Sequence, residues 1–213
     1  MIFNKVDLPH LRSPVTVIGI LALISKDIYA GGELYSLHFC LINKNFIGFI
    51  AMKNSIDPRV RIGHVHLKVA NLQRAVHFYR DILGFDLVQQ YGSQAAFLSA
   101  GGYHHHIGLN TWESENASPP PSFSTGLYHV AILYPERRAL ADALVRLQRA
   151  GYPLEGASDH GVSEALYLRD PDMNGLELYW DRPESQWPRT ADGELEMFTR
   201  RLDLESLRAE LGK

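Results

Sequence analysis

The chain has 213 residues, of which 46% are hydrophobic and 21% are charged, a composition that excludes collagen-like, low-complexity and disulfide-built proteins. Its formal net charge is -3, so no basic surface is expected to attract nucleic acid or an anionic membrane. Cys40 is the only cysteine, which excludes an internal disulfide and favours a cytoplasmic location.

The first 51 residues differ in pattern from the rest of the chain. Residues 15–24 and 46–51 are apolar runs, and neither reaches the roughly 20 apolar residues that cross a bilayer. The first run has the length of a signal-peptide core, but no clear cleavage site follows it. We therefore interpret residues 1–51 as an N-terminal extension outside the functional fold, consistent with translation from an upstream start.

From Ile62 onward one pattern occurs twice. Each copy opens with an alternating strand and continues with an amphipathic helix that stops at a glycine, the residue expected just past a helix C-terminus. The strands begin at Ile62 and Leu127, the helices cover residues 72–83 and 137–150, and the glycines are Gly84 and Gly151. Two more strands, a turn and a last strand follow, so each copy is a β-α-β-β-β module.

The repeat predicts an α+β fold with one domain at residues 60–181. Module one covers 60–112 and module two covers 126–181, and the linker 113–125 is too rich in proline to continue a sheet. The two modules are expected to pair as a half-open barrel around a metal cavity, with their first strands side by side. Residues 182–213 form a C-terminal tail with a short helix, for which Asp203 can serve as the N-cap.

His64 and His129 occupy equivalent places in the two modules, 65 residues apart. Glu177 lies between two leucines, so strand alternation turns its carboxylate to the opposite face from both. A carboxylate facing the cavity is costly unless it is paired or metal-bound. Two imidazoles and a carboxylate on one ion leave positions free for substrate and dioxygen or water, the pattern of non-haem Fe(II) oxygenases. His66, on the same strand face as His64, is the competing ligand.

The run at residues 104–106 contains three histidines and is expected to belong to the last strand of module one. His104 and His106 would then share one face, and His105 the other. His106 falls within one residue of the position equivalent to Glu177. It is interpreted as a fourth ligand or an acid-base group, because histidine titrates near neutral pH, and a structural role is the alternative.

Three segments carry a family resemblance over about residues 61–183: IGHVHLKVANLQRAVHFYRDILGF, TGLYHVAIL and SEALYLRDPDMNGLELYWDRP. They resemble the vicinal-oxygen-chelate superfamily, which includes glyoxalase I, extradiol catechol dioxygenases and fosfomycin-resistance enzymes. The DPD turn followed by LELYW is the most specific part, and the similarity is greatest to catechol 2,3-dioxygenase-like proteins. The resemblance implies that His64, His129 and Glu177 bind the metal, and it selects His64 over His66 because His64 stands seven residues before Asn71.

The resemblance also implies roles for Tyr167 and His160. Tyr167 stands ten residues before Glu177, the spacing at which extradiol dioxygenases carry a tyrosine that hydrogen-bonds the substrate, and core packing is the alternative. His160, in DHGVSEA, resembles the His-Gly-Val-Ser segment of the same enzymes, with a spacing to Glu177 two residues shorter than in some of them. Many of these enzymes have four modules, which leaves open whether a homodimer completes the pocket of this two-module chain.

The implied function is ring-opening dioxygenation of a catechol-like diol. Fe(II) is the expected metal, with manganese, nickel or zinc as alternatives, and His106, His160 and Tyr167 are expected to transfer protons. A glyoxalase-like isomerase or epimerase is the second hypothesis, although that chemistry needs a carboxylate base where this chain has His106. A metal-free protein that binds a small molecule or drug is the third, and the complete ligand set argues against it.

Overall fold

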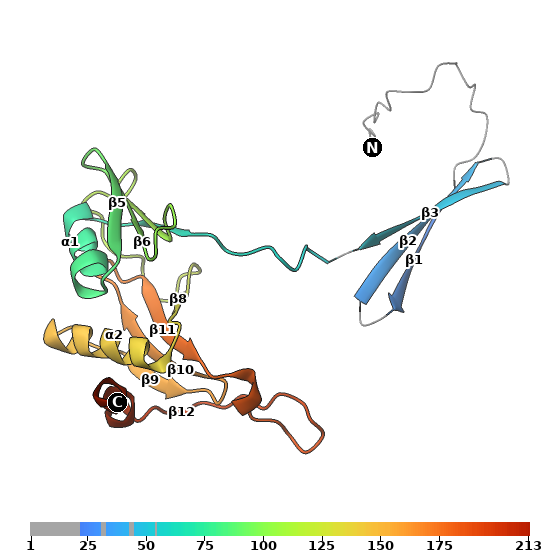
Figure 1. Ribbon diagram of the computed structural model, residues 1–213. Coiled ribbons are helices and arrows are strands. Elements are labelled where there is room, and N and C mark those ends of the chain that lie inside the picture. Colours follow the sequence, from blue (N-terminus) through green and yellow to red (C-terminus); the bar gives the residue numbers. More distant parts are fainter. Residues whose placement is uncertain (1–21, 31–32, 43–44, 54) are drawn as a thin grey trace. The chain divides into compact units, whose positions relative to one another are not determined.

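The computed structural model describes residues 22–30, 33–42, 45–53 and 55–213 (Figure 1). The chain divides into two units, Met1–Arg61 and Ile62–Lys213. The described part of the first unit is an antiparallel sheet of strands β1 (Ala22–Ala30), β2 (Glu33–Ile42) and β3 (Asn45–Lys53), in that order. Strand β3 continues through residue 51, the predicted end of the extension, and most of the apolar run 15–24 lies outside the described residues.

The second unit contains the two predicted modules, and their α+β class is confirmed. Each module has a mixed sheet with one helix packed on it. Module one consists of β4 (Val65–Lys68), α1 (Leu72–Val76), the π-helical η1 (His77–Ile82), β5 (Asp86–Tyr91), β6 (Ala95–Ser99) and β7 (Ile107–Asn110), with sheet order β4-β7-β6-β5. Module two consists of β8 (Val130–Leu133), α2 (Arg137–Arg149), β9 (Gly156–Asp159), β10 (Ser163–Arg169) and β11 (Gly175–Asp181). Its sheet also includes β12 (Arg200–Arg201) from the C-terminal tail, and the strand order is β12-β9-β10-β11-β8.

The helices form where the sequence pattern predicts them. The Asn71 side chain caps α1 by accepting a 2.9 Å hydrogen bond from the backbone N–H of Arg74. The predicted helix at residues 72–83 is continuous but changes to π-helical geometry at His77. Both stop signals are confirmed, because Gly84 and Gly151 have positive φ angles of 91° and 64°, which other residues rarely adopt.

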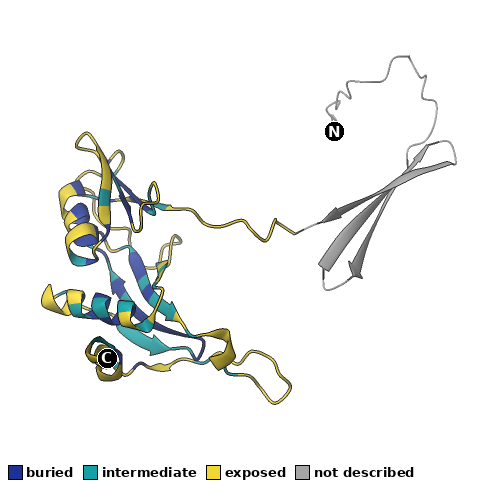
Figure 2. Cartoon of the chain, in the orientation of Figure 1, coloured by how far each residue is buried: buried dark blue, intermediate teal, exposed yellow. Residues whose placement is uncertain are grey.

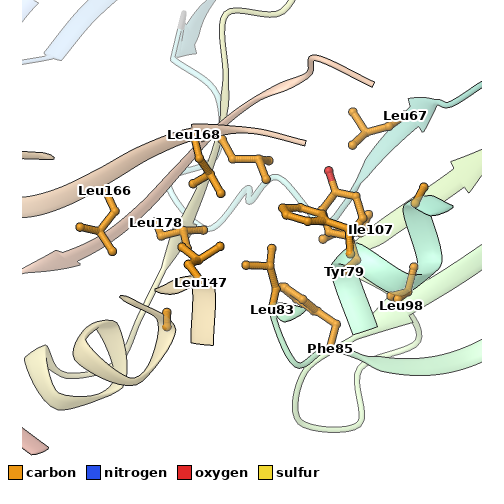
Figure 3. Close-up of a cluster of buried hydrophobic side chains, with 14 of the residues drawn as sticks. Leu67, Tyr79, Leu83, Phe85, Leu98, Ile107, Leu147, Leu166, Leu168 and Leu178 are labelled. Carbon is orange, nitrogen blue, oxygen red and sulfur yellow. The ribbon is translucent and has the colours of Figure 1, made fainter. Parts of the chain in front are cut away.

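One hydrophobic core joins the two modules. The buried faces of α1, η1 and α2 meet side chains from the inner face of both sheets. Figure 3 shows this cluster, in which Leu67, Tyr79, Leu83 and Ile107 come from module one and Leu147, Leu166, Leu168 and Leu178 come from module two. Figure 2 shows the exposed positions gathered mainly in the loops and on the outer faces of the helices.

Polar contacts from the DPD turn also hold the modules together. The buried Asp172 accepts hydrogen bonds of 2.7 Å from the Ala70 backbone N–H and from the Arg74 guanidinium. The buried hydroxyl of Tyr79 donates to Asp170 at 3.0 Å. The turn that is most specific for the family resemblance therefore connects module two to the helix of module one.

The C-terminal tail continues the sheet of module two beyond residue 181. Strand β12 (Arg200–Arg201) pairs with β9, and helix α3 (Leu204–Arg208), capped by Asp203, packs against α2. The tail also contains the short 3-10 helices η2 (Glu184–Gln186) and η3 (Ala209–Gly212). No helix in the described residues has the length and apolar character required for a membrane span.

Candidate active site

Strand pairing in module two brings three predicted site residues to one face. Tyr167 of β10 stands directly opposite Glu177 of β11, whose partner on the other side is Ala131 of β8. Directly paired residues project to the same face of a sheet. His129 lies directly before β8 and two residues from Ala131, so it shares that face. Strands β10 and β11 form a hairpin, and the ten-residue spacing makes Tyr167 and Glu177 a directly opposed pair in it.

Four side chains form a continuous series of contacts on this face. His129 Nε2 lies 3.0 Å from Glu177 Oε2. The Tyr167 hydroxyl donates to Glu177 Oε1 at 2.8 Å, and His160 Nε2 lies 2.8 Å from the same hydroxyl. Burial, the hydrogen bond to Glu177 and the charge of that carboxylate raise the pKa of Tyr167 above its ordinary value. The phenol therefore keeps its proton near neutral pH and acts as a donor.

His129 and Glu177 fit a divalent metal ion. Two atoms bound side by side to one ion, with bonds of 2.0 to 2.2 Å, lie about 3 Å apart, and His129 Nε2 and Glu177 Oε2 have this separation. The Glu177 side chain is only 15% exposed, and the described residues offer it no lysine or arginine partner. In addition, His129 Nδ1 is buried without a hydrogen-bond partner among the described residues, a rare condition that often marks a functional group.

His64 lies apart from this pair. It precedes β4, is exposed, and its ring centroid is 4.4 Å from that of His105. In the part of the chain that the structure describes, no three His, Cys, Asp or Glu side chains are grouped to hold a metal. The structure thus brings together two of the three predicted ligands, and the third remains a prediction.

The competing ligand His66 packs against its own sheet. Its ring lies beside Phe97 and Trp112, with centroid distances of 5.9 and 5.5 Å. A Cβ atom added to Gly108 would approach the His66 ring to 2.9 Å, so the imidazole occupies the space above that glycine. Burial and the nearby His64 lower the pKa of His66, which therefore favours the neutral imidazole.

The structure corrects the predicted position of the histidine run. Residues 104–106 lie in the loop before β7, not within the strand. Val65 pairs with Ile107 and Val130 pairs with Leu176, so the counterpart of Glu177 is Gly108, two residues beyond His106. The difference arises because the connection from β6 to β7, residues 100–106, is two residues longer than the connection from β10 to β11, residues 170–174.

Hydrogen-bond contacts to Nδ1 hold the His106 side chain in this loop. Nδ1 of His106 accepts from the Ala100 backbone N–H at 3.3 Å and lies 3.1 Å from the Ser99 hydroxyl. His104 and His105 contact each other through their Nδ1 atoms at 2.8 Å, and burial together with the neighbouring histidines lowers the pKa of His105. None of these three side chains joins the described contacts of Glu177.

A cavity of about 530 Å³ lies between the first strands of the two modules. Module one contributes His64 and His106 to its lining, and module two contributes residues 130–133 of β8. The described lining does not include His129 or Glu177. Residues at the first strands of both modules therefore line one cavity, and His64 and His106 are part of that lining.

Comparison with known proteins gives one family and several relatives. The family model described as Glyoxalase/Bleomycin resistance protein/Dioxygenase superfamily matches residues 61–178. The chain is 42% identical over 159 residues to a catechol-2,3-dioxygenase of Bacillus subtilis, covering 74% of this chain and 54% of that protein. It is 30% identical over 121 residues to biphenyl-2,3-diol 1,2-dioxygenase 3 of Rhodococcus globerulus, covering 57% of this chain and 63% of that protein.

This chain spans less than two thirds of the length of either relative. Among solved structures, a glyoxalase/dioxygenase from Nostoc punctiforme superposes with a TM-score of 0.50 at 18% sequence identity, covering 62% of this chain and 99% of that chain. This likeness shows that the fold of the second unit is shared.

Proposed function

Because the chain belongs to the Glyoxalase/Bleomycin resistance protein/Dioxygenase superfamily, we propose that it is a metal-dependent extradiol dioxygenase that opens the ring of a catechol-like diol. The observation that carries this proposal is the series of contacts from His129 through Glu177 and Tyr167 to His160. It joins two metal-binding groups to two groups that can transfer protons. Two relatives, a catechol-2,3-dioxygenase and a biphenyl-2,3-diol 1,2-dioxygenase, are both named as dioxygenases of aromatic diols, which supports the same reaction.

His129 and Glu177 are the proposed ligands in this module, and His64 is the proposed third ligand. Fe(II) is the metal proposed for this set, although manganese, nickel and zinc accept the same donors. When bound, the metal would supply Lewis acidity toward both diol oxygens and a position for dioxygen. The carboxylate of Glu177 would balance part of the metal charge, which agrees with the lack of any described lysine or arginine partner.

Tyr167 and His160 are proposed to handle the protons of the reaction. Tyr167 keeps its proton near neutral pH, so its hydroxyl can donate to a diol oxygen in place of Glu177. His160 Nε2 lies within hydrogen-bond reach of the Tyr167 oxygen and can exchange a proton with it. His106 is a less direct candidate, because its described contacts are with Ser99 and Ala100.

We further propose that a second copy of the chain supplies His64. Large apolar side chains next to both histidines support this assignment, since Ile62 is 96% exposed and Tyr128 is 81% exposed. Exposed apolar surface of this kind is typical of an interaction site. A twofold dimer would use the same surface on both chains and would create two equivalent sites.

The test of the proposed function compares two metals at one site. Protein loaded anaerobically with Fe(II) and then given catechol and air should consume oxygen in proportion to a ring-opened product. Zinc-loaded protein should not, because zinc accepts the same ligands but has no redox chemistry. If a panel of catechols gives no oxygen uptake while a hemithioacetal is turned over in a metal-dependent way, the chain is instead a glyoxalase-like isomerase.

A further inference from the structure

The C-terminal tail contacts His160, although it lies outside the residues that match the family model. Figure 1 shows β12 alongside β9. In this antiparallel pair Arg200 stands opposite Asp159 and Arg201 stands opposite Ser158. Continuing the register by one position places Thr199 opposite His160. The tail therefore reaches the last member of the contact series by ordinary strand pairing.

Three hydrogen-bond contacts connect the tail to His160. The Phe198 backbone N–H donates to the carbonyl of His160 at 3.3 Å. Nδ1 of His160 lies 3.1 Å from the Phe198 carbonyl oxygen and 3.2 Å from the Thr199 hydroxyl. A carbonyl can only accept, so Nδ1 must carry the proton in this contact. In a neutral imidazole the lone pair is then on Nε2, which is the atom 2.8 Å from the Tyr167 hydroxyl. The single proton of that hydroxyl therefore has two alternative acceptors, His160 Nε2 and Glu177 Oε1.

Gly161 is independent evidence that the fold requires the tail to lie close to the His160 segment. Its φ angle is 80°, a conformation that favours glycine. A Cβ atom at this position would lie 2.7 Å from the Phe198 ring and 2.7 Å from Pro188. A side chain here would therefore push the tail away from His160. The Arg200 guanidinium also lies over the Phe198 ring, 4.1 Å from the ring centroid.

We propose that residues 198–199 are a positioning element, which holds His160 in the Nδ1–H tautomer with Nε2 directed at Tyr167. The Phe198 carbonyl selects the tautomer, and the Thr199 hydroxyl is a second partner that keeps the ring in place. The catalytic meaning of this role rests on the proposed function, whereas the tautomer is a property of the chain itself. Thr199 is a positioning residue, since it acts on Tyr167 only through His160.

The first experiment reads the tautomer without any turnover. The full chain is labelled with 15N-histidine, long-range 1H–15N correlations are recorded, and His160 is identified by the signal lost in His160→Gln. We expect wild-type His160 to show a proton on Nδ1 and a free Nε2. Gly161→Ala should convert this signal to a mixture of tautomers. A wild-type His160 protonated on Nε2, or a folded Gly161→Ala protein with an unchanged signal, would contradict the proposal.

The second experiment uses Thr199, whose substitutions leave the backbone contacts in place. Thr199→Val should lower kcat for oxygen uptake about threefold to tenfold at constant KM, the effect of one lost hydrogen bond. Thr199→Ser should restore kcat to within about twofold. The matched control is Thr190→Val in the same tail, where the hydroxyl is exposed and contacts only the Glu194 N–H among the described residues.

The two experiments separate the two proposals. If wild-type protein shows no oxygen uptake, the proposed function fails, and the NMR result alone decides the role of the tail. If oxygen uptake is present but Thr199→Val matches wild type in kcat, Thr199 is not a positioning residue. If Gly161→Ala does not fold, which its thermal unfolding would reveal, the wild-type tautomer and the threonine series together decide the outcome.

Discussion

Gly108 and Glu177 occupy equivalent positions in the two modules, but only Glu177 carries a side chain that can bind a metal. In module one the space above Gly108 is filled by the imidazole of His66. The repeat therefore provides one carboxylate ligand, not two. At equivalent positions, module two offers a metal-binding side chain and module one offers space for the His66 ring.

This relationship predicts a local coupling between Gly108 and His66. Gly108→Ala should lower the free energy of unfolding by about 1 kcal/mol, because the added Cβ forces the His66 ring away from its preferred rotamer. The same substitution should be nearly neutral in a His66→Ala background, where the obstacle is absent. Urea unfolding of the four proteins of this double-mutant cycle gives the coupling, and equal effects in both backgrounds would show that the ring is not the obstacle.

Glu177 and Tyr167 are predicted to differ in their effect on metal content. Glu177→Ala should remove most of the bound metal and abolish oxygen uptake, because it deletes the anionic ligand. Tyr167→Phe should keep the metal and lower kcat, because it removes only the hydroxyl that contacts Glu177. Elemental analysis of each purified variant measures the metal, with the exposed linker variant Glu113→Ala as the control. Loss of metal in Tyr167→Phe would indicate that the hydroxyl holds the ligand in place.

Mixing two inactive variants tests whether the site is shared between chains. His64→Ala and Glu177→Ala should each be inactive when alone. If each site takes His64 from one copy and Glu177 from the other, half of the mixed dimers are heterodimers with one intact site. An equal mixture should then recover about one quarter of wild-type activity. No recovery, after confirmed subunit exchange, would place all three ligands in one chain.

Alkaline pH is predicted to destabilise the fold through Tyr134. Burial raises the pKa of Tyr134 to about 12, whereas the unfolded chain ionises near the ordinary value of 10. The folded state therefore binds more protons in this interval, and its stability falls as the pH rises from about 10 to about 12. Tyr134→Phe should reduce the slope by at most about 1.4 kcal/mol per pH unit. Urea unfolding at several pH values measures it, and identical slopes would exclude a contribution from Tyr134.

The sequence predicted most of the second unit, because its elements depend on local pattern. Helical spacing, the cap at Asn71 and the stop at Gly84 are short-range signals, and each corresponds to an observed feature. The contact between Tyr167 and Glu177 could also be predicted from the sequence. The two residues are ten positions apart with a turn between them, a spacing that allows a direct cross-strand pair.

The parts that could not be predicted depend on longer-range geometry. The sequence pattern does not identify the counterpart of Glu177, because two equivalent loops differ in length by two residues and no local signal marks where the extra residues lie. The contact of Thr199 with His160 depends on the two-residue strand β12, which is too short to leave a periodic signal and pairs with a strand far away in the sequence. The position of His64 relative to His129 depends on how whole modules pack.

The pairing of β12 with β9 also has a consequence for synthesis of the protein. Thr199 follows His160 by 39 positions, and at a translation rate of roughly 5 to 20 residues per second this corresponds to about 2 to 8 s. During that interval the nascent chain already contains β9, but its outer edge has no partner from the tail. Open strand edges readily pair with other chains. The growing polypeptide therefore passes through a brief period in which β9 is exposed to aggregation, and the arrival of β12 ends it.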